Sequence, residues 1–298
     1  MSKIVVIGSA NTDMTVKTSH LPLPGETILG GDFFMNQGGK GANQAVAVQR
    51  LGGDLLFVAK LGNDVMGRQA LEAYTAEGMD TRLIRVSDEV TSGVALICVD
   101  ANAENSIVVA SGANMQLNES DVDPALDEMQ AGDILLMQLE IPLSTVLYAA
   151  RKAHQKGAKV ILNPAPATAL PQELFPYLYM ITPNRIEAAM LTGIPTDSEE
   201  GLKQAVQAMT AWGVRRVIVT LGSQGSFVQE GADSYYVEAC KVQPVDTTAA
   251  GDTFNGAVCV GLAEGRSLKE SVQWAARAAA LAVTKFGAQV SIPYRKDL

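Results

Sequence analysis

Ile4-Val5-Val6-Ile7-Gly8-Ser9-Ala10-Asn11-Thr12-Asp13 lies close to the N-terminus, and the architecture of the chain follows from its pattern. The first four residues are apolar without interruption, which is typical of a strand that is buried on both faces. Small and polar residues follow directly, and in open parallel sheets ligands bind beyond the carboxyl ends of the strands. The stretch therefore predicts a central parallel strand that leads into a binding loop.

Similar apolar runs recur along the chain and alternate with helical patterns. The further runs are Leu55–Ala59, Ile134–Gln138, Val160–Asn163, Met180–Thr182 and Val217–Leu221. The helical patterns cover Lys40–Leu51, Gly67–Glu77, Pro142–Lys156, Arg185–Leu191, Gly201–Trp212, Gly251–Glu264 and Leu268–Lys285. Alternation of strand and helix predicts an α/β fold, with a doubly wound, mostly parallel sheet that is flanked by helices on both faces.

Two segments without helical patterns interrupt this alternation. Residues 12–34 carry prolines and a glycine between β-like pieces. Residues 92–110 are typical of a hairpin whose strands, Val94–Val99 and Ser106–Ala110, flank a turn at residues 100–104. We expect the two segments to form a small β-sheet lid, inserted within roughly residues 12–34 and 92–110 of a single domain that spans residues 1–298.

The composition argues against several classes of partner and location. The 298 residues carry a net charge of −9, and a field of this sign repels nucleic acid and anionic membranes. The apolar runs are too short to span a membrane, and the N-terminus lacks the features of a signal peptide. The three cysteines are widely spaced, which predicts buried free thiols. We therefore expect a cytoplasmic protein that binds neither nucleic acid nor membrane.

Several common functional motifs are incomplete in this chain. Gly62–Gly67 has the glycine spacing of a P-loop, but Arg68 and Gln69 follow where Lys and Ser or Thr are needed. The string Gly39–Gln44 begins like a dinucleotide fingerprint and ends in Gln, which disfavours a nicotinamide-dependent oxidoreductase. The only two histidines fit no triad or metalloprotease motif, so we expect them to be surface or packing residues.

The strongest functional pattern is Asp246-Thr247-Thr248-Ala249-Ala250-Gly251-Asp252-Thr253-Phe254-Asn255-Gly256, which opens an apolar helical pattern. The small residues Ala249, Ala250 and Gly251 leave the N–H groups of the helix start unobstructed. Such N–H groups are unpaired and attract anions, including a γ-phosphoryl group in transfer. Asp252 is then a candidate base for an attacking hydroxyl. The alternative is that Asp252 is a helix N-cap, a position that would also place its carboxylate beside these N–H groups.

Two further strings offer hydrogen-bonding groups to a polar ligand. In Asn36–Ala45, glycines allow close approach of a ligand, and Lys40 and Asn43 offer donors to hydroxyls. After the first strand, Asn11 and Asp13 alternate, so both can face one side and bind vicinal hydroxyls. Taken alone, the first string also fits a glycine-rich turn with a solvated lysine, and the second fits an Asn-Asp turn.

Together, these three segments resemble the ribokinase (PfkB-type) carbohydrate kinase family, over essentially the whole chain from Ile4 to Ser291. The Asn36–Ala45 string is similar to the N-terminal signature of the family, and Asp246–Asp252 is similar to its C-terminal signature. The resemblance implies a ribokinase-like fold, ATP as the phosphoryl donor, Mg²⁺ and K⁺ as cofactors, and a homodimer formed through the lid. The substrate that it favours is D-ribose, phosphorylated at the 5-hydroxyl.

The resemblance also implies roles for particular residues. The base would be Asp252, with the turn Ala249, Ala250 and Gly251 around the anion. Sugar contacts would come from Asn11, Thr12, Asp13, Gly39, Lys40, Gly41, Ala42, Asn43, Glu140 and Asp252. ATP contacts would come from Asn184, Thr220, Leu221, Gly222, Ser223, Gln224, Gly225, Gly251 and Asp252. Glu187 would hold Mg²⁺ through water, and the potassium loop would consist of Asp246, Thr248, Ala282, Lys285, Gly287 and Ser291.

Two positions depart from the family pattern, and other functions stay open. The general signature has Gly where Ala249 or Ala250 stands, and Ala276 replaces a His that some members carry near the adenine. Alternatives are a related kinase for deoxyribose, a nucleoside or a ketohexose, and a non-catalytic sugar-binding protein on this fold. Asp13 separates ribose from deoxyribose, which lacks vicinal hydroxyls for it to bind, and the intact Gly251-Asp252 pair favours an enzyme.

Overall fold

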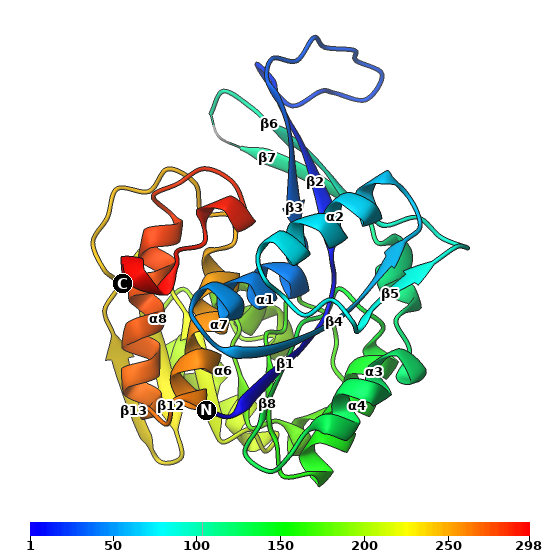
Figure 1. The fold of residues 1–298 in the computed structure, drawn as a ribbon. Helices are drawn as coiled ribbons and strands as arrows, with labels where there is room; N and C mark the ends of the chain where they lie inside the picture. Colours follow the sequence, from blue (N-terminus) through cyan, green and yellow to red (C-terminus); the bar gives the residue numbers. More distant parts are fainter. Residues whose placement is uncertain (103) are drawn as a thin grey trace.

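In a computed structural model, the chain folds around a nine-stranded sheet with helices on both faces (Figure 1). The structure describes residues 1–102 and 104–298. The strand order is β13-β12-β11-β10-β9-β8-β1-β4-β5. Neighbouring strands are parallel from β5 to β11, whereas β12 and β13 are antiparallel. The predicted fold class is therefore confirmed.

The predicted runs and helical patterns correspond to elements of this body. Its strands are β1 (Lys3–Ile7), β4 (Asp54–Gly62), β5 (Ile84–Ser87), β8 (Ile134–Met137), β9 (Lys159–Leu162), β10 (Met180–Ile181), β11 (Arg216–Thr220), β12 (Ser226–Glu230) and β13 (Asp233–Val237). Its helices are α1 (Lys40–Arg50), α2 (Val65–Ala76), α3 (Glu119–Glu128), α4 (Leu143–Gln155), α5 (Arg185–Thr192), α6 (Glu199–Ala211), α7 (Ala250–Ala263) and α8 (Leu268–Ala282). Short 3₁₀ turns are η1 (Gly112–Gln116), η2 (Gln172–Tyr177), η3 (Gly222–Gln224), η4 (Gln289–Ser291) and η5 (Arg295–Asp297).

Two hydrophobic cores lie on the two faces of the sheet, and β1 contributes to both. Ile4 and Val6 belong to the core that α1, α7 and α8 cover, while Val5 and Ile7 belong to the core under α3, α4 and α6. Successive strand residues point to opposite faces, so a strand between two cores must be apolar at every position. All four of these side chains are fully buried.

A second, four-stranded sheet projects from the body (Figure 1). Its order is β3-β2-β6-β7, formed by β2 (Asn11–Lys17), β3 (Phe33–Gly38), β6 (Gly93–Val99) and β7 (Asn105–Ala110). The predicted antiparallel hairpin is β6–β7, and residue 103 in its predicted turn lies outside the described residues. β2 follows the loop after β1, and β3 ends two residues before α1 begins. The small sheet is thus attached directly to the loop and the helix that the sequence singles out.

Several elements differ from the sequence-based predictions. The helix α3, the strand β5 and the hairpin β12–β13 were not predicted. The helix α8 ends at Ala282, short of Lys285, because the Val283 carbonyl instead accepts the N–H groups of Val245 and Asp246 at 2.7 and 3.2 Å. The cysteines are free thiols as expected, but only Cys259 is buried, while Cys98 is partly exposed and Cys240 is exposed. Among the residues that the structure describes, no helix combines the length and apolar character of a membrane span.

Candidate active site

The predicted site residues gather at the carboxyl edge of the parallel strands. The loop after β1 carries Ser9 and leads to Asn11, and the segment after β8 carries Glu140. The segment after β10 leads to Asn184, and β11 ends at Thr220. The helices α1 and α7 pack against each other and both begin at this edge. Parallel strands thus bring together groups that are far apart in sequence, as a doubly wound sheet does for ligands.

The N-terminus of α1 is satisfied by protein groups. Glu140 Oε2 accepts the backbone N–H of Lys40 at 3.0 Å and the Ser9 hydroxyl at 2.5 Å. Ser9 in turn accepts the N–H groups of Gly41 at its hydroxyl (3.2 Å) and of Ala42 at its carbonyl (2.8 Å). The first N–H groups of α1 are therefore not available to an anion. The backbone N–H groups of Lys40, Gly41 and Ala42 are thus already paired, and Lys40 would contact a sugar through its side chain.

Two glycines allow this close packing. Gly39 precedes the helix with a φ of 85°, a left-handed conformation that favours glycine. A Cβ atom on Gly41 would lie 2.5 Å from the Gly8 carbonyl carbon. The glycine-rich string therefore lets α1 approach the loop after β1, with Lys40 and Asn43 at the helix start.

The N-terminus of α7 is open, in contrast to that of α1. Its N-cap is Ala249 in the left-handed conformation (φ 59°), without a side-chain capping bond. The N–H groups of Gly251 and Asp252 have no acceptor among the residues that the structure describes. Unpaired N–H groups and the helix dipole together attract an anion. The alternative reading of Asp252 as an N-cap is wrong, because Asp252 is the third residue of the helix and its carboxylate bonds to α1.

The Asp252 carboxylate lies between the two helices and receives only donors. Asn43 Nδ2 donates to its Oδ2 at 2.9 Å, and Gln44 Nε2 donates to its Oδ1 at 3.0 Å. Asp252 is only 8% exposed, and this burial raises the pKa of its carboxyl above the usual range. The charge of Lys40 and the two amide donors act in the opposite direction. These donors favour the charged form, which is the form that can accept a proton.

The predicted sugar groups of β2 lie near this carboxylate. Asn11 is buried, and its Oδ1 accepts a 2.7 Å hydrogen bond from Asn114 Nδ2. Burial, followed by the charges of Glu140 and Asp252, raises the pKa of Asp13 to about 7. Thr12 is buried between them, and strand alternation places its side chain on the opposite face of β2 from Asn11 and Asp13.

Lys40 is the cation at the centre of an acidic site. Burial disfavours its charge, but the carboxylates of Asp252, Glu140, Glu187 and Asp13 outweigh this and raise the pKa of Lys40. Burial raises the pKa of Glu187, although the hydrogen bond from the Asn184 N–H and the charge of Lys40 oppose the shift. Four carboxylates around one ammonium leave the site short of positive charge. This charge distribution fits a ligand that arrives with a divalent cation.

Two of the predicted nucleotide residues, Asn184 and Thr220, lie at the start of α5, whereas Gly251 and Asp252 lie on α7. Asn184 caps α5: its Oδ1 accepts the Glu187 N–H, and Glu187 Oε2 accepts the Asn184 N–H, both at 2.8 Å. The Asn-x-x-Glu spacing is thus a capping box, and the other Glu187 oxygen has no hydrogen-bond partner in the part of the chain that the structure describes. Thr220 bridges to Asn184, and the turn that follows it, residues 222–224, is exposed.

The Asp246 side chain organises the predicted potassium loop. Its Oδ1 accepts the Thr248 N–H and hydroxyl at 2.9 and 2.6 Å, and its Oδ2 accepts the Gly287 N–H at 2.9 Å. Ser291 lies nearby in sequence, and its hydroxyl bonds to the Ala288 carbonyl. The carboxylate therefore joins the segment before α7 to the segment after α8. Lys285 at this bend is exposed.

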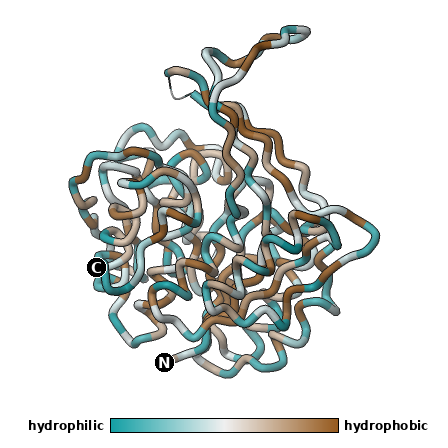
Figure 2. The backbone as a smooth tube through the Cα atoms, turned by 45° about the horizontal axis from the view of Figure 1, so that its top comes forward, coloured by the Kyte–Doolittle hydropathy of each residue, from teal (hydrophilic) through white to brown (hydrophobic). Residues whose placement is uncertain are grey.

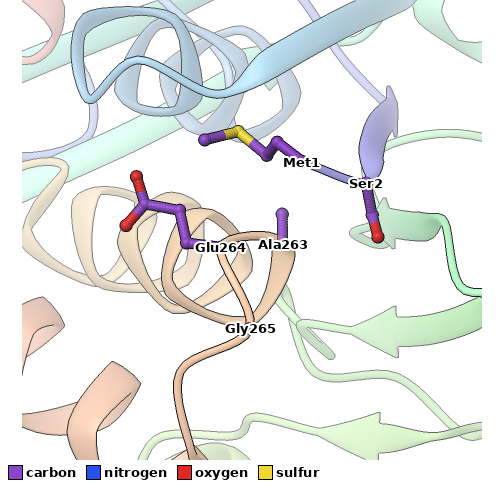
Figure 3. A pocket seen from close by; sticks show the side chains of 5 residues that line it. All are labelled: Met1, Ser2, Ala263, Glu264 and Gly265. Carbon is purple, nitrogen blue, oxygen red and sulfur yellow. The ribbon is translucent and has the colours of Figure 1, made fainter.

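Several buried residues of the site were not predicted from the sequence. Gln44, Asn114, Gln138 and Asn163 all bond to predicted site residues or to one another. Gln44 lies in one of the strings to which the sequence analysis gave a binding role, whereas Gln138 and Asn163 only end two of the apolar runs that it assigned to strands. A separate hollow of about 620 Å³ is lined by Met1, Ser2, Ala263, Glu264 and Gly265 (Figure 3). It lies at the opposite end of β1 and contains none of the predicted site residues.

Comparisons with known proteins agree with this architecture. Residues 1–295 match the model of the pfkB family of carbohydrate kinases. The chain is 43% identical to the ribokinase of Haemophilus influenzae, over 99% of this chain and 96% of that protein. It is 34% identical to the deoxyribokinase of Salmonella typhi, over 97% and 95% of the two chains.

A solved structure of Arabidopsis thaliana ribokinase complexed with ribose and ATP superposes with a TM-score of 0.91. The identity is 36%, and the match covers 99% of this chain and 96% of that one. The family match, the sequence relatives and the solved structure each cover nearly the full length of the chain and indicate the same family. The chain belongs to the pfkB family of carbohydrate kinases.

Proposed function

We propose that this protein is an ATP-dependent ribokinase that phosphorylates the 5-hydroxyl of D-ribose. The observation that carries the proposal is the pairing of an open helix N-terminus with a buried carboxylate: the free N–H groups of Gly251 and Asp252 lie beside the Asp252 side chain. The open helix N-terminus can bind the negative charge of a phosphoryl group, and the carboxylate can accept the proton of a hydroxyl. The full-length similarity to ribokinases supports the choice of reaction.

In this reaction the sugar oxygen bonds to the γ-phosphorus while the bond from that phosphorus to the β–γ bridging oxygen breaks. ADP leaves, and the hydroxyl proton passes to Asp252. In a loose transition state the proton can leave late, so alignment and charge neutralisation supply most of the catalysis. The N–H groups at the start of α7 would bind the equatorial oxygens. Closure of the small sheet over the site, as a lid on one domain, would exclude water that competes with the sugar.

The residues present fit the metal ions that the family implies. Mg²⁺ binds through few carboxylates and keeps several waters, so the free oxygen of Glu187 is sufficient together with nucleotide phosphates. When bound, Mg²⁺ would supply positive charge to a site that holds four carboxylates and one lysine. The loop that Asp246 organises offers backbone carbonyls near Ala282 and Ser291, which suit K⁺. The carboxylate itself is used to hold the loop together.

Ribose is favoured over deoxyribose by the position of Asp13. Asp13 and Asn11 stand on one face of β2, close enough to the charges of Glu140 and Asp252 for these to shift the pKa of Asp13. Such a carboxylate is suited to accept hydrogen bonds from two neighbouring hydroxyls. The similarity to a deoxyribokinase makes deoxyribose the alternative to test first.

A panel of sugars tests the proposed substrate. ADP release would be measured with ATP, Mg²⁺ and K⁺, using ribose, deoxyribose, a nucleoside and a ketohexose at equal concentration. We expect ribose to give the highest kcat/KM. A higher kcat/KM with another sugar would replace ribose as the substrate, and sugar binding without ADP release would indicate a binding protein.

We further propose that the protein forms a homodimer through the small sheet. Its strands form a projection from the body that includes stretches of hydrophobic residues (Figure 2), and several of their apolar side chains are exposed. The exposed residues are Phe33, Met35, Leu96, Ile107, Val108 and Val109. Pairing would remove this surface from water. Sedimentation of the wild type and of Leu96→Glu checks the assembly, with a dimer expected for the first and a monomer for the second.

The proposed location is the cytoplasm. Three free thiols support it, since disulfides form and persist in oxidising compartments and the exposed Cys240 is unpaired.

A further inference from the structure

A chain of buried amides stands behind Asp252. Gln44 Nε2 donates to Asp252 Oδ1 and to Asn163 Oδ1, both at 3.0 Å. Gln138 Nε2 donates to Gln44 Oε1 at 2.6 Å. Gln44 and Gln138 are fully buried, and Asn163 is 7% exposed. The three residues come from α1, the segment after β8 and the segment after β9, so three different elements meet behind one carboxylate.

A backbone carbonyl fixes the direction of these hydrogen bonds. Asn163 Nδ2 donates to the Thr182 carbonyl oxygen at 3.0 Å, and a carbonyl can only accept. Asn163 must therefore direct its Oδ1 toward Gln44, and Gln44 must donate to this oxygen from its Nε2. The second hydrogen of this Nε2 is then directed to Asp252. A flipped Gln44 would place an oxygen against two other oxygens, which buried groups do not tolerate.

The side chain of Thr182 reaches the other half of the site. Its hydroxyl donates to Asn255 Oδ1 at 2.6 Å, and Asn255 Nδ2 donates to the Gly251 carbonyl at 2.9 Å. The direction is again fixed by a backbone carbonyl at the end of the chain. One residue at the end of β10 is thus linked to the Asp252 carboxylate through Asn163 and Gln44. It is linked to the first turn of α7 through Asn255.

We infer that Gln44 is a positioning residue that holds Asp252 as an ionised carboxylate in one orientation, and that Thr182 sets the direction of Gln44 through Asn163. The inference rests on the proposed function in its assumption that Asp252 must accept a proton. Both partners of the carboxylate, Asn43 and Gln44, are donors, so a protonated Asp252 would face N–H groups with its own hydrogen. A buried carboxylate that lost either donor would bind its proton more tightly.

The test is a pH titration of the Asp252 side-chain carboxyl in the folded, full-length protein without ligands. The ¹³C chemical shift of the carboxyl carbon reports its protonation, and the signal is assigned by its absence in Asp252→Asn. The variants are Gln44→Met, Asn163→Leu and the double variant. Gln49→Met is the matched control, because Gln49 lies on the same helix and, within residues 1–102 and 104–298, its Nε2 bonds only to the carbonyls of Glu77 and Gly78. Removal of one hydrogen bond to a charged group is expected to raise the Asp252 pKa by about one unit in Gln44→Met.

Gln49→Met is expected to leave the pKa unchanged, and Asn163→Leu to raise it by less than Gln44→Met. The double variant should titrate like Gln44→Met, because Asn163 acts through Gln44. An Asp252 pKa in Gln44→Met equal to that of Gln49→Met would overturn the role of Gln44. Additive shifts in the double variant would overturn the coupling through Asn163.

If Gln44→Met fails to fold, Gln44→Glu keeps the shape of the side chain. It replaces the donor by an oxygen that must share a proton with Asp252. The Asp252 titration is then expected to move upward, and an unmoved titration would overturn the inference. The titration needs no substrate, so its result is separate from the proposed function, which fails instead if Asp252→Asn keeps the wild-type rate.

Discussion

Asn114 Nδ2 donates a 2.7 Å hydrogen bond to Asn11 Oδ1, and this contact determines which end of the Asn11 amide is free for a ligand. Asn114 Oδ1 accepts the N–H of Ala10 at 2.9 Å, and an N–H can only donate. The direction of both amides is therefore fixed. Asn11 is left with its Nδ2, a donor, for a sugar oxygen.

We predict that Asn114→Leu raises KM for ribose about tenfold with a smaller change in kcat. Asn11 would lose its orientation, and the buried Ala10 N–H would be left unpaired, which costs about 1–3 kcal/mol. Initial rates at varied ribose concentration and thermal unfolding check both effects. Asn118→Ser is the control, since it keeps a capping oxygen on α3. An unchanged KM in Asn114→Leu would show that Asn11 does not bind the sugar.

The pKa of Asp13 predicts that ribose binds better above neutral pH. Burial raises this pKa to about 7, so much of the population is protonated at pH 6 and loses an acceptor for the sugar hydroxyls. KM for ribose is expected to fall between pH 6 and pH 8. In Asp13→Asn, KM should be high and independent of pH in this range. A KM of the wild type that rises with pH would contradict the role of Asp13.

The same pKa shift acts on the stability of the ligand-free protein. The folded-state pKa lies above the ordinary value of 3.8, so the folded state holds a proton that the unfolded chain has lost. The stabilising contribution of the neutral carboxyl is present below pH 3.8 and is lost as pH rises to about 7. We therefore expect Asp13→Asn to exceed the wild type in free energy of unfolding by more at pH 8 than at pH 5. Urea unfolding at the two pH values measures this difference.

Gly251→Ala should separate stability from activity. Gly251 has open space around the position of a Cβ atom, and Ala stabilises a helix by up to about 1 kcal/mol relative to Gly. The variant should thus unfold at the same or a higher temperature. The added methyl group would stand beside the free N–H groups of α7, so kcat/KM should fall about tenfold or more. Full activity would mean that the phosphoryl group binds elsewhere.

The Arg50 side chain holds the segment that ends the proposed potassium loop. It pairs with Glu77 and donates to the carbonyls of Gln289 and Ile292 at 2.6 and 2.8 Å, on either side of Ser291. We predict that Arg50→Met lowers the free energy of unfolding by about 1–3 kcal/mol, because the two carbonyls lose a charged donor and the partly exposed Glu77 loses its partner. It should also raise the K⁺ concentration needed for half-maximal activity. An unchanged K⁺ requirement in folded Arg50→Met would show that this segment does not hold the ion.

The body of the fold was largely predictable from the sequence, because strands such as Ile4–Ile7 that lie between two cores are apolar at every position. The helix α3 was missed since it contains Pro124 and several acidic residues, and the buried residue Asp121 interrupts the set of apolar residues on its inner face. The hairpin β12–β13 was missed because an antiparallel edge carries polar residues such as Gln229 and Asp233.

The site was predictable only where its residues lie in dense local strings. Asp252 and Asn43 stand in such strings, but the partners that orient them are distant in sequence. Gln44 and Asp252 are 208 residues apart, and Asn11 and Asn114 are 103 residues apart. Such pairs form only when the sheet brings strand ends together. The prediction of Asp252 as an N-cap failed because α7 begins before Asp252, at Ala250. Its N-cap is Ala249 in the left-handed conformation, which is rare for alanine and was not expected from the sequence.

The central claim is that the chain transfers a phosphoryl group to ribose with Asp252 as the base. It is tested most directly by ribose-dependent ADP release from ATP, compared between the wild type and Asp252→Asn at saturating substrates. The amide keeps the size of the side chain but cannot accept the proton. We predict ribose-dependent turnover by the wild type and a loss of kcat of about 100-fold or more in the variant, with a folded protein. Turnover by Asp252→Asn at the wild-type rate would contradict the claim.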